Sequence, residues 1–428
     1  MKIIKTASCG LCALLLSLSS ASAIIWTGSN GTDWYTGGNW DANRVPVSGD
    51  AVLVASSTIT MSGSNAYATD VTLGYTSTTA GQMTVSDNAY WTINNALFVG
   101  SYHYSKYTLT IDNSTVNNNG YAYLGYYSNS EGSVTVNGDS LFRVKDNLWI
   151  GDSGKGTLVV NSGTVQTNNL HLGYSAAGNG TLIIGGDGSG KIIDNSGNAV
   201  AIKGWAGASK VVFDHNGTAN FANSILSMGA SKTSIEHNGT GTTILSGTSN
   251  IKGGITVNNG SLLVNNTVTT GTTVNVSHGL LGGTGVIKGG RVAVASGAHL
   301  ATSLTLSNGL TLDAGSYLDY IGDGARLALS AGSLILGGEI IVDFSAVLLD
   351  EMLEYVVMDW NGNSSVGSVD VSKFIASGAE GQFKLNGNTL VFQGVSSVPE
   401  PSTYFLFGIG IGLLCLLRLH KARNRSLD

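Results

Sequence analysis

Cysteine and proline are almost missing from this chain. Of its 428 residues, three are cysteine and three are proline, whereas 60 are glycine. Cys9 and Cys12 lie near the N-terminus and Cys415 lies near the C-terminus, so residues 24–398 contain no cysteine. This excludes disulfide bonds, thiolate metal sites and a cysteine nucleophile from that region. Abundant glycine without proline, in a chain rich in Thr, Ser, Asn and Val, indicates short strands joined by tight turns.

Positive charge is also scarce. Residues 24–398 carry 15 Lys and Arg against 25 Asp and Glu, a net charge of −10. Such a surface argues against nucleic acid and against an anionic polysaccharide as directly bound partners, unless a divalent ion bridges the two. The seven histidines show no pair at metal-ligand spacing. We therefore expect no metal, no cofactor and no enzymatic activity.

The N-terminus has the three regions of a secretory signal peptide. Lys2 and Lys5 precede an apolar stretch at residues 11–18, and Ala21-Ser22-Ala23 forms a small-residue cleavage site. Residues 1–23 are therefore predicted to be removed before Ile24, and the rest of the chain to be exported.

The C-terminus combines three elements in residues 398–428. Val398, Pro399, Glu400 and Pro401 are followed by an apolar run at residues 404–417, and several basic residues close the chain. A single transmembrane helix with its basic end in the cytoplasm is predicted here. The preceding chain would then be held at the cell envelope or surface, anchored in the membrane before processing.

This order resembles the PEP-CTERM sorting signal of bacteria, whose motif is matched without a gap by Val398, Pro399, Glu400 and Pro401. The resemblance implies that the chain is a substrate of an exosortase, a membrane-embedded protease or transpeptidase, which would cut near these prolines. Both prolines hold the segment extended, as a protease requires. The alternative is a plain anchor helix with a proline-containing spacer.

Residues 67–252 contain a repeated sequence unit. A short apolar segment ending in glycine recurs, and the successive glycines Gly74, Gly100, Gly125, Gly151 and Gly173 have spacings of 26, 25, 26 and 22. A second alternating strand follows each copy, and a third follows in several, as at Trp91-Thr92-Ile93. Because one such unit cannot bury its own apolar side, the period predicts an all-β fold, a parallel β-solenoid. About 15 coils at ~4.8 Å would give a rod of roughly 70 Å. A β-sandwich is the competing architecture.

Other segments extend this domain plan. Residues 24–66, which contain Trp26, Trp34 and Trp40, are expected to form an N-terminal cap, with a sugar-binding patch as the alternative. Residues 253–340 carry GxLxVxxG-like units that resemble the autotransporter-associated β-strand repeat, which again implies a solenoid. Residues 341–397 are expected to form a C-terminal β cap that protects the open end.

Two outward ladders are candidate sites. Phe98, Tyr123, Trp149 and His171 occupy the middle of the first strand in successive copies, so they face outward and could stack on sugar rings of an extracellular polysaccharide. The alternative is an aromatic ladder that only stabilises the sheet. The second ladder consists of turn aspartates that could bind calcium or simply favour turns: Asp87, Asp112, Asp139 and Asp187.

Three classes of function follow. The favoured one is a non-catalytic structural protein of the surface or extracellular matrix. The second is an adhesin or glycan-binding rod that uses the aromatic ladder. The third is a polysaccharide lyase or glycosidase, for which Arg143, Lys145 and Asp146 are the only candidate residues.

Overall fold

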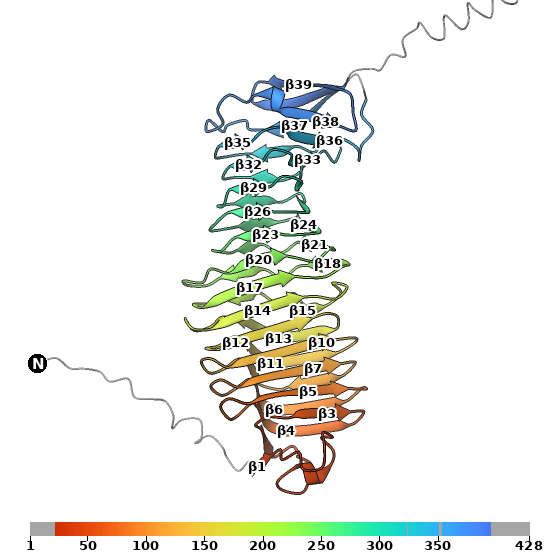
Figure 1. Cartoon of the computed structure of the whole chain (residues 1–428), viewed down its shortest axis with the longest axis vertical. Helices are drawn as coiled ribbons and strands as arrows, with labels where there is room; N and C mark the ends of the chain where they lie inside the picture. Colours follow the sequence, from red (N-terminus) through yellow and green to blue (C-terminus); the bar gives the residue numbers. More distant parts are fainter. Residues whose placement is uncertain (1–21, 323, 351–352, 395–428) are drawn as a thin grey trace, which may run out of the picture.

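A computed structural model describes residues 22–322, 324–350 and 353–394. Within these ranges the chain forms a long stack of β-coils without an α-helix, with two short 3₁₀ turns, η1 (Gly37–Asn39) and η2 (Val371–Lys373) (Figure 1). Most strands pair in parallel with the equivalent strands of the coils before and after them. This parallel stacking is the arrangement of the predicted β-solenoid and differs from a β-sandwich, whose sheets are antiparallel.

Three sheets run along the stack. The largest has 19 strands: β1 (Ser22–Ile25), β2 (Asp50–Val54), β4 (Asn65–Leu73), β6 (Tyr90–Val99), β8 (Thr115–Asn118), β9 (Tyr121–Leu124), β11 (Leu141–Ile150), β13 (Thr164–Leu172), β15 (Lys191–Ile193), β16 (Ile202–Gly204), β19 (Ile225–Ser227), β22 (Ser249–Asn250), β25 (Thr267–Thr269), β28 (Val286–Lys288), β31 (Thr305–Leu306), β34 (Leu327–Leu329), β37 (Glu354–Asp359), β39 (Gly381–Asn386) and β40 (Thr389–Gly394).

The second sheet has 13 strands: β3 (Thr58–Ser62), β5 (Ala80–Ser86), β7 (Lys106–Asp112), β10 (Glu131–Asn137), β12 (Lys155–Val160), β14 (Asn179–Ile184), β17 (Ala208–Phe213), β20 (Ser234–His237), β23 (Ile255–Val257), β26 (Val274–Val276), β29 (Val292–Val294), β32 (Leu310–Leu312) and β35 (Leu334–Leu336). The third has eight: β18 (Thr218–Phe221), β21 (Thr242–Leu245), β24 (Ser261–Val264), β27 (Leu280–Gly282), β30 (His299–Ala301), β33 (Tyr317–Asp319), β36 (Ile340–Asp343) and β38 (Phe374–Ser377).

The alternation of apolar and polar residues sets the inside of the stack. Leu73, Val99, Leu124 and Ile150 are fully buried and lie opposite one another on successive coils. They belong to one hydrophobic cluster that runs from Ile24 to Phe392 through the whole stack. A single coil would leave this column exposed, so each coil depends on its neighbours for burial.

The repeat glycines end the first strand as expected. Gly74, Gly100, Gly125, Gly151 and Gly173 all adopt positive φ, from 56° to 77°. A side chain would also collide with the next coil, since a Cβ on Gly125 would overlap the Lys155 carbonyl oxygen. Glycine is therefore required at this corner for both backbone conformation and space.

The expected third strand is not separate. Trp91-Thr92-Ile93 forms the first part of β6, which continues to Val99, and β11 is continuous in the same way. Irregularities in register, such as the one between Val144 and Asn147, bend these long strands at a corner. In β6 and β11 the third segment of one copy and the first segment of the next are thus one strand that covers two sides of the coil, whereas β8 and β9 divide the same stretch into two strands.

Coil size changes along the stack. Hydrogen bonds between neighbouring coils show this: Arg143 contacts Asn117 at a sequence separation of 26, whereas Thr284 contacts Asn265 at a separation of 19. We call residues 65–213 the wide half and residues 255–312 the narrow half. The stack becomes visibly slimmer towards β29 and β32 (Figure 1).

Both ends of the stack are closed by aromatic residues. Trp26, Trp34 and Trp40 are at most 5 % exposed and pack edge to face, and Trp34 also contacts Trp91. Their burial supports the packing role over a sugar-binding patch. At the other end, β37 and β39 both pair antiparallel with β40, which interrupts the parallel stacking.

The predicted membrane helix at residues 404–417 and most of the predicted signal peptide, residues 1–21, lie outside the described residues. Among the residues that are described, no helix is long and apolar enough to cross a membrane. Ser22 and Ala23 form the start of β1, which pairs with β2. Cleavage before Ile24 would leave the paired Ile24 and Ile25 in place.

Candidate functional site

The aromatic ladder lies on the outer surface of the wide half. Phe98 of β6 is paired with Tyr123 of β9, Tyr123 with Trp149 of β11, and Trp149 with His171 of β13. Phe98 lies outside the core cluster, while its neighbours in the strand, Leu97 and Val99, belong to it. The ladder therefore faces outward, as the alternation predicted.

The rings of the ladder stack on one another. Phe98 and Tyr123 have centroids 5.2 Å apart at 5°, and Tyr123 and Trp149 have centroids 4.4 Å apart at 6°. Trp149 and His171 follow at 5.6 Å and 23°. Phe98 is 9 % and His171 8 % exposed, and Tyr123 and Trp149, which are stacked on both faces, are partly buried. Ring edges, rather than ring faces, are left for a ligand.

Trp205 closes the ladder at its C-terminal end. Its indole Nε1 donates a hydrogen bond to His171 Nδ1 at 2.8 Å, so the proton of the neutral imidazole lies on Nε2. Nε2 lies 3.4 Å from Asn147 Oδ1, which can accept that proton's hydrogen bond. Burial, with a smaller contribution from the Lys203 charge, lowers the pKa of His171 to about 4. His171 is therefore neutral at pH 7.

A second column of side chains flanks the ladder. Tyr126 and Tyr174 meet the ladder rings edge-on, at 4.8 Å from Tyr123 and 6.4 Å from Trp149 respectively. Asp152 takes the equivalent position on the coil between them, and burial raises the pKa of its carboxyl group. Burial and, less strongly, the Asp152 charge raise the pKa of Tyr123. A half-buried carboxylate thus lies within the electrostatic reach of the ladder.

The sequence predicted the four ladder residues but missed Tyr121, Asp152 and Trp205 as parts of the same cluster. Tyr121 meets both Tyr123 and Trp149 edge-on. Asp152 and Trp205 each follow a repeat glycine. Tyr126 and Tyr174 also follow such glycines, Gly125 and Gly173, so inspection of the residue after the glycine in every copy would have found Asp152 and Trp205.

The stacking of the rings argues against the glycan-binding hypothesis for the four ladder residues. Sugar rings pack against exposed aromatic faces, and the faces of Tyr123 and Trp149 are occupied by their neighbours on both sides. Tyr174, at 46 % exposed, is the most accessible ring that touches the ladder. The arrangement favours a ladder that stabilises the sheet, and glycan binding by Phe98, Tyr123, Trp149 and His171 stays a prediction.

The turn aspartates lie at another corner of the wide half. Asp87 accepts hydrogen bonds from the hydroxyls of Ser62 and Ser86, at 2.6 and 3.1 Å, and these bonds lower the pKa of Asp87. Asp187 accepts a hydrogen bond from the Ser189 N–H at 2.9 Å. Within the described ranges no group of three or more His, Cys, Asp or Glu side chains could hold a metal ion. These contacts favour turn formation over calcium binding.

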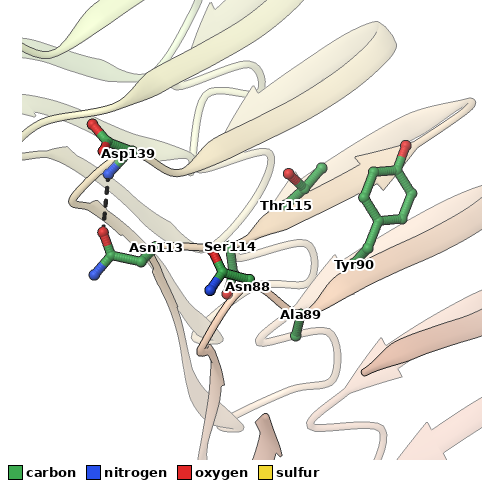
Figure 2. A pocket seen from close by; sticks show the side chains of 7 residues that line it. All are labelled: Asn88, Ala89, Tyr90, Asn113, Ser114, Thr115 and Asp139. Atoms are coloured by element: carbon green, nitrogen blue, oxygen red, sulfur yellow. Dashed lines mark hydrogen bonds between the residues drawn. The ribbon is translucent and has the colours of Figure 1, made fainter. Parts of the chain in front are cut away.

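A polar hollow of about 200 Å³ lies at the same corner (Figure 2). Asn88, Asn113 and Asp139 are successive corner residues, and the Asp139 N–H donates to Asn113 Oδ1 at 3.2 Å. Tyr90 and Thr115 form its other side. Asn88 and Asn113 adopt positive φ, so the amide side chains serve the turn geometry.

Of the three residues considered for polysaccharide cleavage, Arg143 alone has a side-chain hydrogen bond within the part of the chain that the structure describes. Arg143 Nη1 donates to Asn117 Oδ1 at 3.0 Å, which ties it to the neighbouring coil. Lys145 and Asp146 are exposed and lie at the bend of β11. The enzymatic alternative stays a prediction that rests on these residues alone.

The comparison with protein families matches residues 397–421 to the PEP-CTERM protein-sorting motif. The match contains Val398, Pro399, Glu400 and Pro401, which lie outside the described residues. It supports export of the chain and processing by an exosortase. The resemblance of residues 253–340 to the autotransporter-associated repeat stays a prediction. Comparisons with curated proteins and with solved structures gave no match.

Proposed function

We propose that the chain is a non-catalytic structural shaft of the bacterial cell surface or extracellular matrix, exported, held by its C-terminal helix and released or transferred by an exosortase. The observation that carries the proposal is the continuous buried column from Ile24 to Phe392, joined in sequence to the sorting motif at residues 397–421. A shaft of stacked coils spaces whatever it carries away from the membrane.

Deletion of residues 398–428 tests the sorting part of this proposal. The shortened chain is expected in the culture medium, whereas the intact chain stays with the envelope until it is processed. Alanine at Pro399 and Pro401 together is the finer variant, because it keeps the apolar run and removes only the extended motif. Accumulation of this variant in an unprocessed form supports exosortase cutting. Normal processing of it, or envelope retention of the deletion, contradicts the proposal.

A second candidate function is glycan binding beside the aromatic ladder. It is supported by Tyr174, 46 % exposed, next to Trp149 and near the half-buried Asp152 carboxylate. An aromatic face combined with a carboxylate that accepts hydrogen bonds from hydroxyl groups suits a neutral sugar.

A glycan array distinguishes this candidate from a purely structural ladder. Tyr174→Ala is expected to abolish binding without lowering the melting temperature, since its ring is largely outside the stack. Replacement of Phe98, Tyr123 and Trp149 by alanine should lower both glycan binding and the melting temperature. An array on which the intact chain binds nothing rejects the candidate and leaves the structural shaft untouched.

A further inference from the structure

The outer face of the 13-stranded sheet carries two rows of hydroxyl groups in the wide half. One row pairs Thr108 with Ser133, Ser133 with Thr157 and Thr157 with Thr181. The other row pairs Thr84 with Thr110 and Thr110 with Thr135. We call these seven residues the hydroxyl array. They point outward, because the residues between them on each strand, such as Leu109 and Val134, are fully buried.

The hydroxyl array is regular in two directions. Neighbouring coils are ~4.8 Å apart, and residues two apart on one strand are roughly 6.6 Å apart. Six of the seven residues are threonine, and the exception is Ser133. Threonine is β-branched and has few χ1 rotamers, so the backbone holds the spacing of the threonine hydroxyl and methyl groups. The result is a rigid lattice of small groups instead of a flexible polar surface.

None of the seven hydroxyls makes a hydrogen bond to another residue in the part of the chain that the structure describes. Hydroxyls elsewhere in the wide half are used internally: Ser105 and Ser130 donate to the carbonyls of Tyr102 and Tyr127. The array therefore presents all its donors and acceptors to whatever lies on this face. Threonine is favoured in strands, so the feature that distinguishes this face is the alignment of its hydroxyls over successive coils.

The outward-facing residues that flank the two rows on each strand mark the borders of the array. On one side, Glu131 forms ion pairs with Lys106 and Lys155 at 2.7 and 3.8 Å. On the other, Asn161 donates to Asn137. The seven residues between these borders carry no charge and no aromatic ring. This composition does not suit a sugar, which would need an aromatic face and carboxylates or amides.

We propose that the hydroxyl array binds ice. Ice is the ligand whose surface repeats in two dimensions and offers hydrogen bonds at every lattice point, and rigid rows of threonine present methyl and hydroxyl groups at a matching kind of repeat. Water ordered on the array would join the growing crystal and hold the protein on its surface. An exported shaft would thereby act on ice outside the cell.

Inhibition of ice recrystallisation by the purified full-length chain is the test. The intact protein is expected to keep ice grains small during annealing in the frozen state. The double variant Thr110→Tyr with Thr135→Tyr should lose this effect, because two large side chains lift the ice from the plane. Tyrosine is favoured in strands, so the fold should persist, as circular dichroism would check.

A matched control lies on the same sheet. Thr256 of β23 faces outward between Glu236 and Asn275 and belongs to no row of hydroxyls, so Thr256→Tyr should leave ice grains as small as with the intact protein. If the double tyrosine variant does not fold, the double variant Thr110→Val with Thr135→Val is used in its place. It exchanges each hydroxyl for a methyl group of similar size and should enlarge the ice grains. Large grains with the intact protein, or small grains with the double variant, overturn the proposal. A dimer in sedimentation velocity that only the double variant dissociates would assign the face to a second copy and overturn it as well.

Discussion

The coils of the wide half and the coils of the narrow half both enclose a buried apolar column, but a wide coil uses more residues to do so. Narrow strands such as β26 and β29 have three residues, of which two point inward and one outward. In the wide half, β7 and β10 of the same sheet have seven residues, and β6 and β11 of the 19-stranded sheet have ten and cover two sides of a coil. In the narrow half most side chains of a strand therefore point into the core. In the wide half each strand also has several outward-pointing side chains, which form extended outer surfaces.

Those extra outward positions carry the candidate surfaces. The aromatic ladder lies on one side of the wide half, and the hydroxyl array lies on the 13-stranded sheet. In the narrow half, each strand of that sheet offers a single outward residue, such as Asn275 or Ala293, and no two-dimensional array forms. A long coil can thus display a surface, while a short coil mainly extends the rod.

The largest effect is expected from a side chain at Gly132 in the wide half. A Cβ there would overlap the Val99 carbonyl oxygen, which belongs to the backbone of the preceding coil and cannot rotate away. Gly132→Val is expected to cost about 4 kcal/mol or more and to unfold the wide half. Denaturant unfolding followed by hydrogen exchange would measure it.

Gly297 in the narrow half is the matched control. Its Cβ would meet nothing within 4 Å, although its φ is 75°. Gly297→Ala should therefore cost only about 1 kcal/mol, from the left-handed backbone. Equal losses for the two variants would refute the idea that contact with the backbone of the neighbouring coil sets the cost at Gly132.

The second-largest effect is expected from acid, which should lower the free energy of unfolding of the wide half. The folded-state pKa of His171 is about 4, below the unfolded value of about 6.5, so the unfolded state binds more protons between these values. The stability that depends on a neutral His171 is fully present above about pH 6.5 and is lost as the pH falls, by about 3 kcal/mol at about pH 4. Protonation of Nδ1 also breaks the hydrogen bond from Trp205.

Unfolding free energies measured from pH 7 to pH 4 would check this dependence. His171→Asn should flatten the profile, because asparagine does not titrate in this range. His215 and His237 also have pKa values lowered by burial, so part of the slope will remain. An identical slope in the variant would show that His171 is not the acid-sensitive group.

Loss of one ring from the aromatic ladder should have a smaller effect. Trp149 stacks on both Tyr123 and His171, so Trp149→Ala is expected to cost about 1–3 kcal/mol for the two ring contacts. Trp149→Tyr should restore most of this loss, because a flat ring again fills the gap. Thermal melting of the two variants would show whether stacking, rather than polarity, is what matters.

The smallest effect is expected at the edge of the hydroxyl array. Glu131 pairs with Lys106 and Lys155, and all three side chains are more than a third exposed. Glu131→Gln should therefore cost about 0.5 kcal/mol at low salt and nearly nothing at high salt. A loss that persists in high salt would mean that these pairs contribute more than exposed ion pairs do.

Much of this molecule could be predicted from its sequence, because the repeat places the same residue types at the same point of every coil. The glycine spacings of 26, 25, 26 and 22 reappear as the register of the parallel strands. The outward position of Phe98, Tyr123 and Trp149 followed from alternation. The residues of the hydroxyl array are visible in the sequence as well. Their alignment in two rows, however, could be recognised only once the register of the strands was known.

The sequence alone determined that the part of the chain the structure describes is all-β, that its coils stack and which residues point inward, because these depend on local alternation and on burial of one face. Tertiary structure decided how the outward residues meet. Trp205 reaches His171 from 34 positions away, and the rings of Tyr123 and Trp149 close on each other's faces. Such contacts depend on the length of each coil and on side-chain rotamers across neighbouring coils, and neither is encoded in any single repeat.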